Sequence, residues 1–373
     1  MLHVIAGLNT GGAERMLSKV IAGSRGTEFE HKVLVLGPVG PLADDIRASG
    51  SEVVALNLQR KSLNLDSATR VLRTIKAMAP VAVQGWMYHG NLAALLGASL
   101  GRTQSTVLWN IRSGWQRLES SHLLTRSIMR GSAVISGLAD AIIYNSRRAR
   151  GEHEARGYAS RAGLVIPNGF NTEGFVPSRE HYETLRSKLG LSASTPIIGI
   201  IARNDATKDY TTFFRAVCIA AARNRDIHWV VVGRGIDAQS KEVIDAGASG
   251  YMERVSFMGE RREIEQLAPA FDVATLSSNV EGFPNVVGEA MACGVPCVVT
   301  DAGDSGFVVG DTGTVVPIAD PGALADGWLE TIEMSASDRL ARGAAARKRI
   351  IENFEISRIS EQYANLYRSL LRR

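Results

Sequence analysis

The sequence lacks the features of membrane-spanning, secreted and disulfide-bonded proteins. Its 373 residues contain no run of 18 or more apolar residues, so no membrane-spanning helix is predicted. The N-terminus, M-L-H-V-I-A-G-L, has no basic segment and is predicted to be a strand rather than a signal peptide. Cysteines are few: Cys218, Cys293 and Cys297 form no C-x-x-C pair, so we expect them in the core rather than in disulfides or a metal site. These absences favour a cytoplasmic protein.

The basic residues are unevenly distributed and are not interleaved with aromatic residues, which argues against a nucleic-acid partner. Residues 1–172 carry 20 Lys and Arg against 11 Asp and Glu, whereas the rest of the chain carries 22 against 27. A basic half joined to an acidic half indicates that the first half meets something anionic. A membrane surface or a phosphorylated acceptor fits this charge pattern best.

Residues 115–130 alternate apolar side chains with the basic residues Arg117, Arg126 and Arg130. A basic amphipathic segment of this kind can lie on an anionic bilayer. An ordinary helix packed on its sheet has the same pattern, so both interpretations stay open. If the segment binds lipid, the protein would be peripheral on the inner face of the cytoplasmic membrane.

Strands alternate with helical patterns along the chain, which predicts an α/β fold with parallel sheets. Because the chain is too long for one compact core, we expect two doubly wound domains that face one another across a cleft. A segment rich in Pro, Gly and Asn marks the boundary, and the predicted domains span residues 1–170 and 171–354. The stretch from Ser337 is predicted to be helical, and its end, about 355–373, is expected to pack back onto the first domain. The predicted strands are Leu2–Ala6, His31–Leu36, Glu52–Leu56, Val81–Gln84, Thr106–Asn110, Ala141–Tyr144, Gly163–Ile166, Pro196–Ala202, His228–Val232, Val255–Met258, Val273–Leu276, Cys297–Thr300 and Thr314–Val316.

Two glutamates eight positions apart, Glu281 and Glu289, bracket the most informative segment, E-G-F-P-N-V-V-G-E. It follows a predicted strand and leads into a helical pattern. If Pro284 is the first helical residue, its missing N–H costs nothing, and the free amides of that turn face an anion or a hydroxyl-rich ligand. Glu289 would lie on the same helix. A sugar nucleotide, which has both a diphosphate and hydroxyls, suits this arrangement.

Two cations five residues apart, Arg203 and Lys208, follow the predicted strand I-I-G-I-I-A. In a cleft they could hold a diphosphate and neutralise the charge that grows on it as its bond to a sugar breaks. The alternative is that both are solvated charges of a surface loop.

Three further features follow strands of the first half. Gly11 and Gly12 precede a helix, where glycines let the backbone approach a pyrophosphate. No G-x-G-x-x-G is present there, which counts against hydride chemistry. His89 could bond a sugar hydroxyl and Arg112 could contact a phosphate or the acceptor, although a packed or surface role is as consistent with either residue.

Taken together, the segments resemble glycosyltransferase family 4, whose members have the GT-B fold of two facing Rossmann-like domains. The matching segments are G-L-N-T-G-G-A-E-R, V-I-P-N-G-F-N-T-E-G-F, I-A-R-N-D-A-T-K-D-Y, V-V-G-R-G, V-S-F-M-G, E-G-F-P-N-V-V-G-E-A-M-A-C-G-V-P-C-V-V-T-D and V-G-D-T-G-T-V-V-P. The resemblance implies a retaining, metal-independent transfer from a nucleotide sugar, which is a substrate, so that no cofactor is expected. We expect a UDP-sugar donor and a glycan or lipid-diphosphate-linked acceptor in polysaccharide biosynthesis.

The resemblance also implies roles for single residues. Arg203 and Lys208 match the pair that holds the donor diphosphate. Glu281 matches the glutamate that contacts the donor sugar, and Glu289 the one that takes the ribose hydroxyls. Gly11 and Gly12 match a loop that closes over the phosphates. Met258 and Gly259 match the loop beside the base. The other expected donor-binding residues are Gly282, Phe283, Pro284 and Asn285.

The chain departs from the family pattern in two places. Many members have a histidine where this chain has Arg112, so His89 is expected to supply part of that role among the catalytic residues, and Arg112 is an acceptor-side candidate. The segment D-A-G-D-S-G-F-V-V-G-D-T-G replaces the common G-G-x-x-E and resembles a subgroup associated with bacterial surface polysaccharides.

Two other functions are consistent with two such domains. A nucleotide-sugar epimerase would need acid and base groups around the sugar, and the intact R-x4-K and E-x7-E spacings argue against it. A non-catalytic nucleotide-sugar-binding subunit would keep the nucleotide site without turnover. The presence of all four charged residues, Arg203, Lys208, Glu281 and Glu289, argues for activity.

Overall fold

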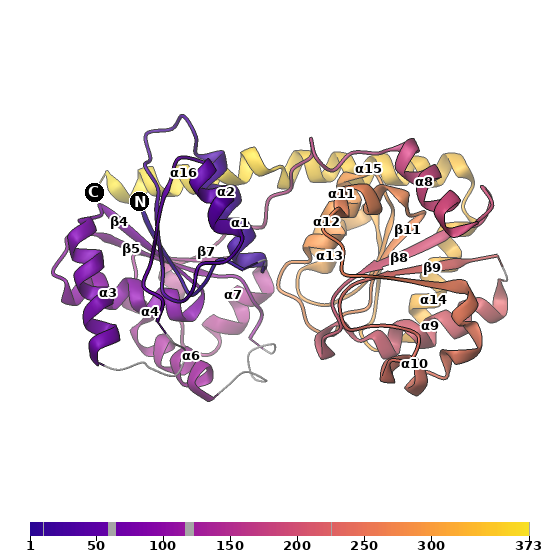
Figure 1. The fold of residues 1–373 in the computed structure, drawn as a ribbon, viewed down its shortest axis with the longest axis horizontal. Helices are drawn as coiled ribbons and strands as arrows, with labels where there is room; N and C mark the ends of the chain where they lie inside the picture. The colour runs from indigo at the N-terminus through magenta and orange to yellow at the C-terminus, as the bar shows by residue number, and fades with distance from the viewer. Residues whose placement is uncertain (10, 59–64, 116–122, 225, 373) are drawn as a thin grey trace. The chain divides into compact units, whose positions relative to one another are not determined.

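The computed structural model describes every residue except 10, 59–64, 116–122, 225 and 373. The chain forms two compact units (Figure 1). The first consists of Met1–Gly169 together with Ile356–Arg373, and the second of Phe170–Glu355. No helix among the described residues is both long and apolar enough to cross a membrane.

The first unit has a seven-stranded parallel sheet in the order β3-β2-β1-β4-β5-β6-β7. Its strands are β1 (Leu2–Ile5), β2 (Lys32–Val35), β3 (Glu52–Ala55), β4 (Ala82–Trp86), β5 (Thr106–Ile111), β6 (Ala141–Tyr144) and β7 (Gly163–Val165). Its helices are α1 (Gly12–Gly23), α2 (Leu42–Ala48), α3 (Leu65–Met78), α4 (Met87–Leu100), α6 (Leu123–Ile135), α7 (Arg147–Glu154) and α16 (Ile356–Leu371).

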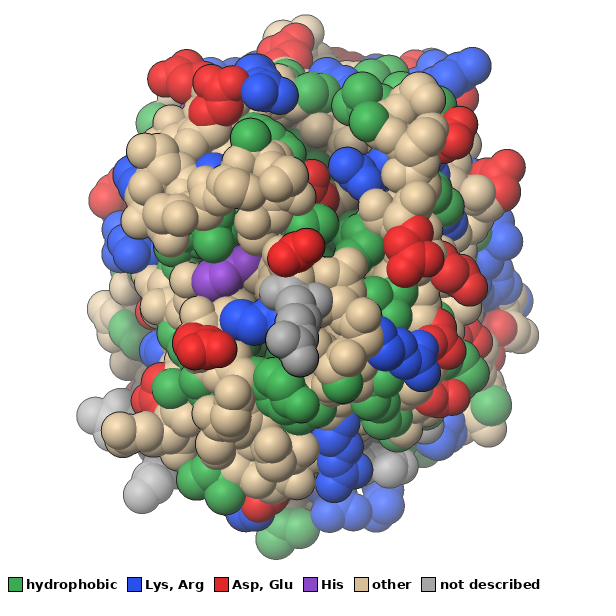
Figure 2. Space-filling model, turned by 90° about the vertical axis from the view of Figure 1, so that its right-hand side faces the viewer, with side chains coloured by type: hydrophobic (Ala, Val, Ile, Leu, Met, Phe, Trp, Pro, Cys, Tyr) green, Lys and Arg blue, Asp and Glu red, His purple; other side chains and the backbone are tan. Residues whose placement is uncertain are grey.

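The second unit has a six-stranded parallel sheet in the order β10-β9-β8-β11-β12-β13. Its strands are β8 (Ile197–Ile201), β9 (His228–Val232), β10 (Val255–Gly259), β11 (Val273–Leu276), β12 (Cys297–Thr300) and β13 (Thr314–Val316). Its helices are α8 (Arg179–Leu189), α9 (Tyr210–Arg223), α10 (Lys241–Asp245), α11 (Ile264–Leu267), α12 (Asn285–Ala292), α13 (Ser305–Val309), α14 (Pro321–Glu333) and α15 (Ala336–Phe354). Acidic and basic side chains are interspersed on the face of the molecule shown in Figure 2.

The strand order fixes where each sheet can bind a ligand. The central strands are largely apolar because helices cover both faces; every residue of β9 and β11 is buried. The chain reverses its direction of travel across the sheet between β1 and β4 in the first unit, and between β8 and β11 in the second. Ligands of doubly wound sheets bind at the carboxyl ends of the strands at this point. The loops that follow β8 and β11 are therefore the first place to look in the second unit.

The predicted C-terminal helical stretch consists of two helices, α15 and α16. Glu355 is extended between α15 and α16 and forms an isolated parallel bridge with Phe170. The Phe170 amide also donates to the Phe354 carbonyl at 2.8 Å. Pairing with a residue 185 positions away therefore interrupts the helix, at the point where the chain returns to the first unit.

Candidate functional site

An ion pair lies at the reversal point of the second sheet. Lys208 ends the short 3-10 helix that follows β8, and Glu281 lies in the loop that follows β11. The Lys208 ammonium donates to the Glu281 Oε1 atom. The side chains are only 16% and 7% exposed, respectively, so this charge pair is largely shielded from water. The geometry thus brings together one predicted phosphate-binding cation and one predicted sugar-binding carboxylate.

Hydrogen bonds to main-chain carbonyls tie the two loops to each other. The Ser277 hydroxyl donates to the Lys208 carbonyl at 2.8 Å, and the Asn279 amide donates to the Thr207 carbonyl at 2.9 Å. Because main-chain carbonyls accept both bonds and neither bond involves the Lys208 ammonium, the relative position of the two loops does not depend on the long Lys208 side chain.

Arg203 has a different environment from Lys208. Its side chain is half exposed and donates to the Asp205 Oδ2 atom at 3.0 Å. The other carboxylate oxygen of Asp205 accepts the Thr207 amide at 3.0 Å and so stabilises the turn that carries Lys208. Arg203 is therefore a surface cation near the start of the loop, and its role toward a diphosphate stays a prediction.

The helix after Glu281 begins one residue later than predicted. The Gly288 amide bonds to the Pro284 carbonyl at 3.4 Å, and Pro284 is extended with φ −80° and ψ 97°. Pro284 is thus the N-cap rather than the first helical residue, and Asn285 begins α12. The N-cap contributes no side-chain hydrogen bond, as expected of proline. Glu289 is the fifth residue of this helix and is 9% exposed.

Phe283 was predicted to bind the donor, but its ring packs in the core. The ring centroid lies 6.1 Å from that of Phe170 and 5.6 Å from that of Phe354. This residue therefore anchors the loop between Glu281 and α12. Any contact it makes with a ligand would involve its main chain.

The loop that follows β12 holds the Glu281 loop from the other side. The Asp304 amide donates to the Gly282 carbonyl at 3.1 Å. Gly303 has φ +59°, and a Cβ atom there would lie 2.5 Å from the Glu281 carbonyl oxygen. Only glycine combines this conformation with so close an approach.

The predicted base-side residues lie at the edge of the same sheet. Met258 and Gly259 end β10, which is separated from β8 by β9. Gly259 has φ +67° and accepts the Gly233 amide at 2.8 Å, and Met258 is partly buried against the core. A role beside a nucleotide base remains a prediction for both.

In the first unit, three predicted residues lie beside the reversal point between β1 and β4. Gly11 is the N-cap of α1, which follows β1, and Gly12 is the first residue of that helix. His89 is the third residue of α4, directly after β4, and is half-buried. The topology thus brings these three to the same edge of the sheet, and their ligand roles stay predictions.

Arg112 is part of a buried network within the first unit. Its guanidinium donates to the Asn110 side chain at 3.1 Å, to the Tyr363 hydroxyl at 2.9 Å and to the Asn168 side-chain oxygen. Burial lowers the pKa of this guanidinium. These contacts join β5, the residues before the unit boundary, and α16. They support a structural role, and the predicted contact with an acceptor remains untested. The sequence could not reveal partners 56 and 251 positions away.

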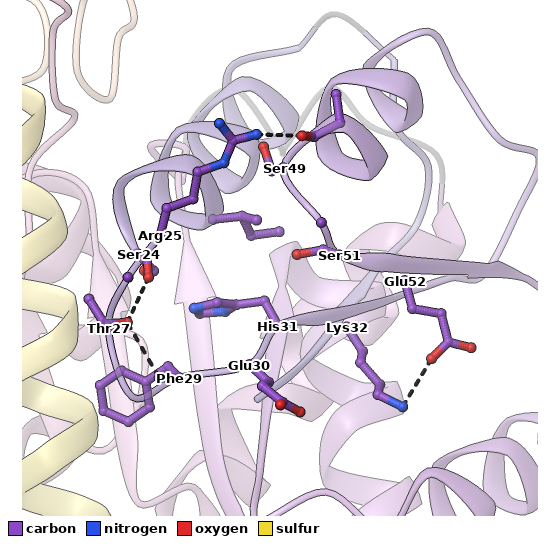
Figure 3. Close-up of a pocket in the computed structure, with 14 residues that line it drawn as sticks. Ser24, Arg25, Thr27, Phe29, Glu30, His31, Lys32, Ser49, Ser51 and Glu52 are labelled. Carbon is purple, nitrogen blue, oxygen red and sulfur yellow. Dashed lines mark hydrogen bonds and ion pairs between the residues drawn. The ribbon is translucent and has the colours of Figure 1, made fainter.

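A cavity of about 700 Å³ lies elsewhere in the first unit (Figure 3). Its lining includes His31 and Lys32 at the start of β2, Ser51 and Glu52 at the start of β3, and Arg25 after α1. It therefore opens at the amino ends of the strands, the opposite edge from Gly11 and His89. The predicted site residues are not among those that line it.

A comparison with protein families finds that residues 195–334 match the model of the glycosyl transferases group 1. This range includes Arg203, Lys208, Glu281 and Glu289. Among curated proteins, the chain is 24% identical over 349 residues to the predicted glycosyltransferase EpsF of Bacillus subtilis, which covers 90% of this chain and 88% of that protein. It is 29% identical over 244 residues to the lipopolysaccharide core mannosyltransferase LpsB of Rhizobium meliloti, covering 62% and 66%. An N-acetyl-α-D-glucosaminyl L-malate synthase of Bacillus anthracis is 36% identical over 124 residues, about a third of either chain.

Solved structures share the fold over nearly the whole chain. HepE of Anabaena, solved with UDP and glucose, superposes with a TM-score of 0.83 at 21% identity and covers 99% of both chains. The lipopolysaccharide glycosyltransferase WaaG superposes with a TM-score of 0.72 at 14% identity, covering 98% of this chain and 99% of the other. The solved structures confirm the predicted GT-B fold, and the family match covers residues 195–334 of the chain. They give no support to an epimerase or a non-catalytic subunit.

The packing at Gly303 yields a test of the loop geometry. We expect Gly303→Ala to lower the free energy of unfolding by at least about 2 kcal/mol, because it adds overlap with the Glu281 carbonyl to the cost of a left-handed alanine. Gly247→Ala is a matched control: φ there is +69° but nothing lies within 4 Å, so it should cost about 1 kcal/mol. Urea unfolding compares the two, and an equal loss in both variants would contradict the packing argument.

Proposed function

We propose that the chain is a group 1 glycosyltransferase, on the match of residues 195–334 to that family, and that it transfers the sugar of a nucleotide sugar bound at the carboxyl ends of β8 and β11. The observation that carries this proposal is the ion pair between Lys208 and Glu281. It joins a cation suited to a diphosphate and a carboxylate suited to sugar hydroxyls at the one point of this sheet where its topology favours a ligand.

The proposed donor site assigns one part of the ligand to each group. The Lys208 ammonium would turn from Glu281 to the diphosphate, and the start of α12 would present backbone amides to the same phosphates. Glu281 would then accept hydrogen bonds from sugar hydroxyls. Glu289, one turn into α12, would take the ribose hydroxyls. Arg203 would add a second positive charge from the surface of the β8 loop.

We propose a retaining reaction that uses neither a protein nucleophile nor a metal. The bond between the anomeric carbon and the diphosphate oxygen breaks, and the acceptor oxygen forms its bond to the same carbon on the same face of the sugar. The acceptor proton passes to an oxygen of the leaving diphosphate. Lys208 neutralises the charge that grows on this leaving group, which is where a fixed charge lowers the barrier most. His89 stays a candidate for contacts to a sugar hydroxyl.

A UDP-sugar is the donor that the comparisons favour, since HepE was solved with UDP and with UDP-glucose. A glycan or a lipid-diphosphate-linked sugar is the favoured acceptor. One relative, 23% identical over 207 residues, is a galactosyltransferase of Escherichia coli that acts on α-D-GlcNAc-diphosphoundecaprenol. The excess of basic residues in the first half also suits an anionic acceptor.

We also propose that α6 contacts an anionic bilayer. Met129 is 1% exposed and packs in the core, so one side of this helix is an ordinary packed face. On the opposite side Leu123 and Val134 are 78% and 86% exposed, and the exposed Arg130 lies between them at helical spacing. Apolar side chains beside a cation suit the boundary between lipid headgroups and acyl chains. Arg117, also predicted to belong to this surface, lies outside the described residues.

Removing either member of the ion pair should abolish sugar transfer. We expect Lys208→Ala and Glu281→Ala each to lower the rate by about 10²–10³-fold, because each removes a contact to the donor. Each single variant also leaves a shielded charge without its partner, which destabilises the fold. The double variant Lys208→Met/Glu281→Gln removes both charges, and it therefore tests whether activity is lost while the protein stays folded. Lys241→Ala, at an exposed pair with Asp245, is the control and should stay active. Wild-type turnover in either single variant would refute the assignment.

The donor base can be identified from thermal stability. A ligand that binds only the folded protein raises its melting temperature. We expect UDP and UDP-sugars to raise it, by several degrees at a concentration about 100 times Kd, and GDP- and ADP-sugars to raise it less. A larger shift with a GDP- or ADP-sugar would reject uridine. Slow hydrolysis of the best donor without acceptor would identify a transferase rather than a binding subunit.

Membrane binding is tested by co-sedimentation with anionic liposomes. We expect the wild-type protein to sediment with vesicles rich in anionic lipid, and Arg126→Glu/Arg130→Glu to reduce this by at least about tenfold, since each charge near the surface contributes about 1 kcal/mol. A matched charge reversal in the second unit, Arg223→Glu, should leave sedimentation unchanged. Equal sedimentation of wild type and the α6 variant would contradict the proposal.

A further inference from the structure

We propose that Ser278 is a positioning residue that holds the Glu281 carboxylate when Lys208 turns from it to the donor diphosphate. The inference rests on the proposed function, and it concerns a residue that the sequence patterns did not single out. Its basis is that two hydrogen-bond donors meet at one oxygen atom of Glu281.

The Oε1 atom of Glu281 accepts from two side chains at once. The Ser278 hydroxyl donates to it at 2.8 Å, and the Lys208 ammonium donates to the same atom. The Glu281 side chain is 7% exposed and Ser278 is fully buried. A shielded carboxylate that lost every donor would be strongly disfavoured, because little water can replace them.

The two donors differ in how they are held. Ser278 has a one-carbon side chain, and the Thr300 hydroxyl of β12 donates to its carbonyl at 2.7 Å. The next residue, Asn279, bonds through its amide to the Thr207 carbonyl at 2.9 Å. Lys208, in contrast, carries its ammonium on a flexible four-carbon chain. Ser278 is therefore the fixed donor to Glu281, and Lys208 is the one that can leave.

This difference gives Ser278 its function. When a diphosphate draws the Lys208 ammonium away, the serine hydroxyl keeps Oε1 bonded and holds the carboxylate in place. The other carboxylate oxygen then points to the sugar hydroxyls. Without Ser278, Glu281 would depend on Lys208 alone, so that release of Lys208 to the diphosphate becomes harder. Both donor binding and the step that follows should suffer.

The test is a double-mutant cycle between Ser278→Ala and Glu281→Ala, measured as kcat/KM for the donor. We expect Ser278→Ala in the wild-type background to lower this value roughly 10- to 100-fold, the range of one hydrogen bond to a charged group. In the Glu281→Ala background the same change should have less than about a threefold effect, because there is no carboxylate left to position. Thr331→Val is the matched control, since its hydroxyl is equally buried and donates to the Gly327 carbonyl at 2.7 Å in the same unit.

The outcomes separate the two claims. An equal loss of kcat/KM from Ser278→Ala in both backgrounds, or a loss no larger than that of Thr331→Val, would overturn the role of Ser278 while the donor site stands. If Glu281→Ala itself transfers sugar at the wild-type rate, the donor-site assignment fails, and the role of Ser278 fails with it. Melting temperatures of all variants show whether each is folded.

Discussion

The ion pair between Lys208 and Glu281 is the interaction on which the account of this protein depends. Each residue alone is an unremarkable loop charge, and each follows a different strand. The parallel sheet brings the two loops together because β8 and β11 are neighbouring strands. In the sequence, 71 residues lie between the end of β8 and the start of β11. A pair this shielded is costly to assemble, since both charges lose water, so it is a poor source of stability. In the proposed reaction its members separate, one to the leaving group and the other to the sugar.

The surrounding backbone keeps this arrangement in place while its charges exchange partners. Hydrogen bonds to main-chain carbonyls join the loops after β8 and β11, and Gly303 lets the loop after β12 approach the Glu281 carbonyl. Phe283 anchors the same segment in the core. The candidate site thus lies on loops that are bonded to one another and packed on the core, with one long side chain as its movable part, so that it can bind a large anion without rebuilding those loops.

Much of the fold could be predicted from the sequence because it depends on local patterns. The bounds of β6, β9, β11, β12 and β13 were predicted to the residue, since each is an apolar run between polar or Gly- and Pro-containing turns. The roles that depend on distant partners could not be predicted. The Arg112 network requires Tyr363, and the burial of Phe283 follows from Phe354. Ser278 carries no signal in the sequence, because a serine after a strand is common and only its distance to Glu281 gives it meaning.

The most direct test of the account is an experimental structure of the protein with a UDP-sugar bound. The account predicts a phosphate oxygen within about 2.7–3.2 Å of the Lys208 Nζ atom, with Glu281 facing the sugar and still bonded to the Ser278 hydroxyl. A diphosphate bound away from Lys208, with the pair between Lys208 and Glu281 intact, would contradict it.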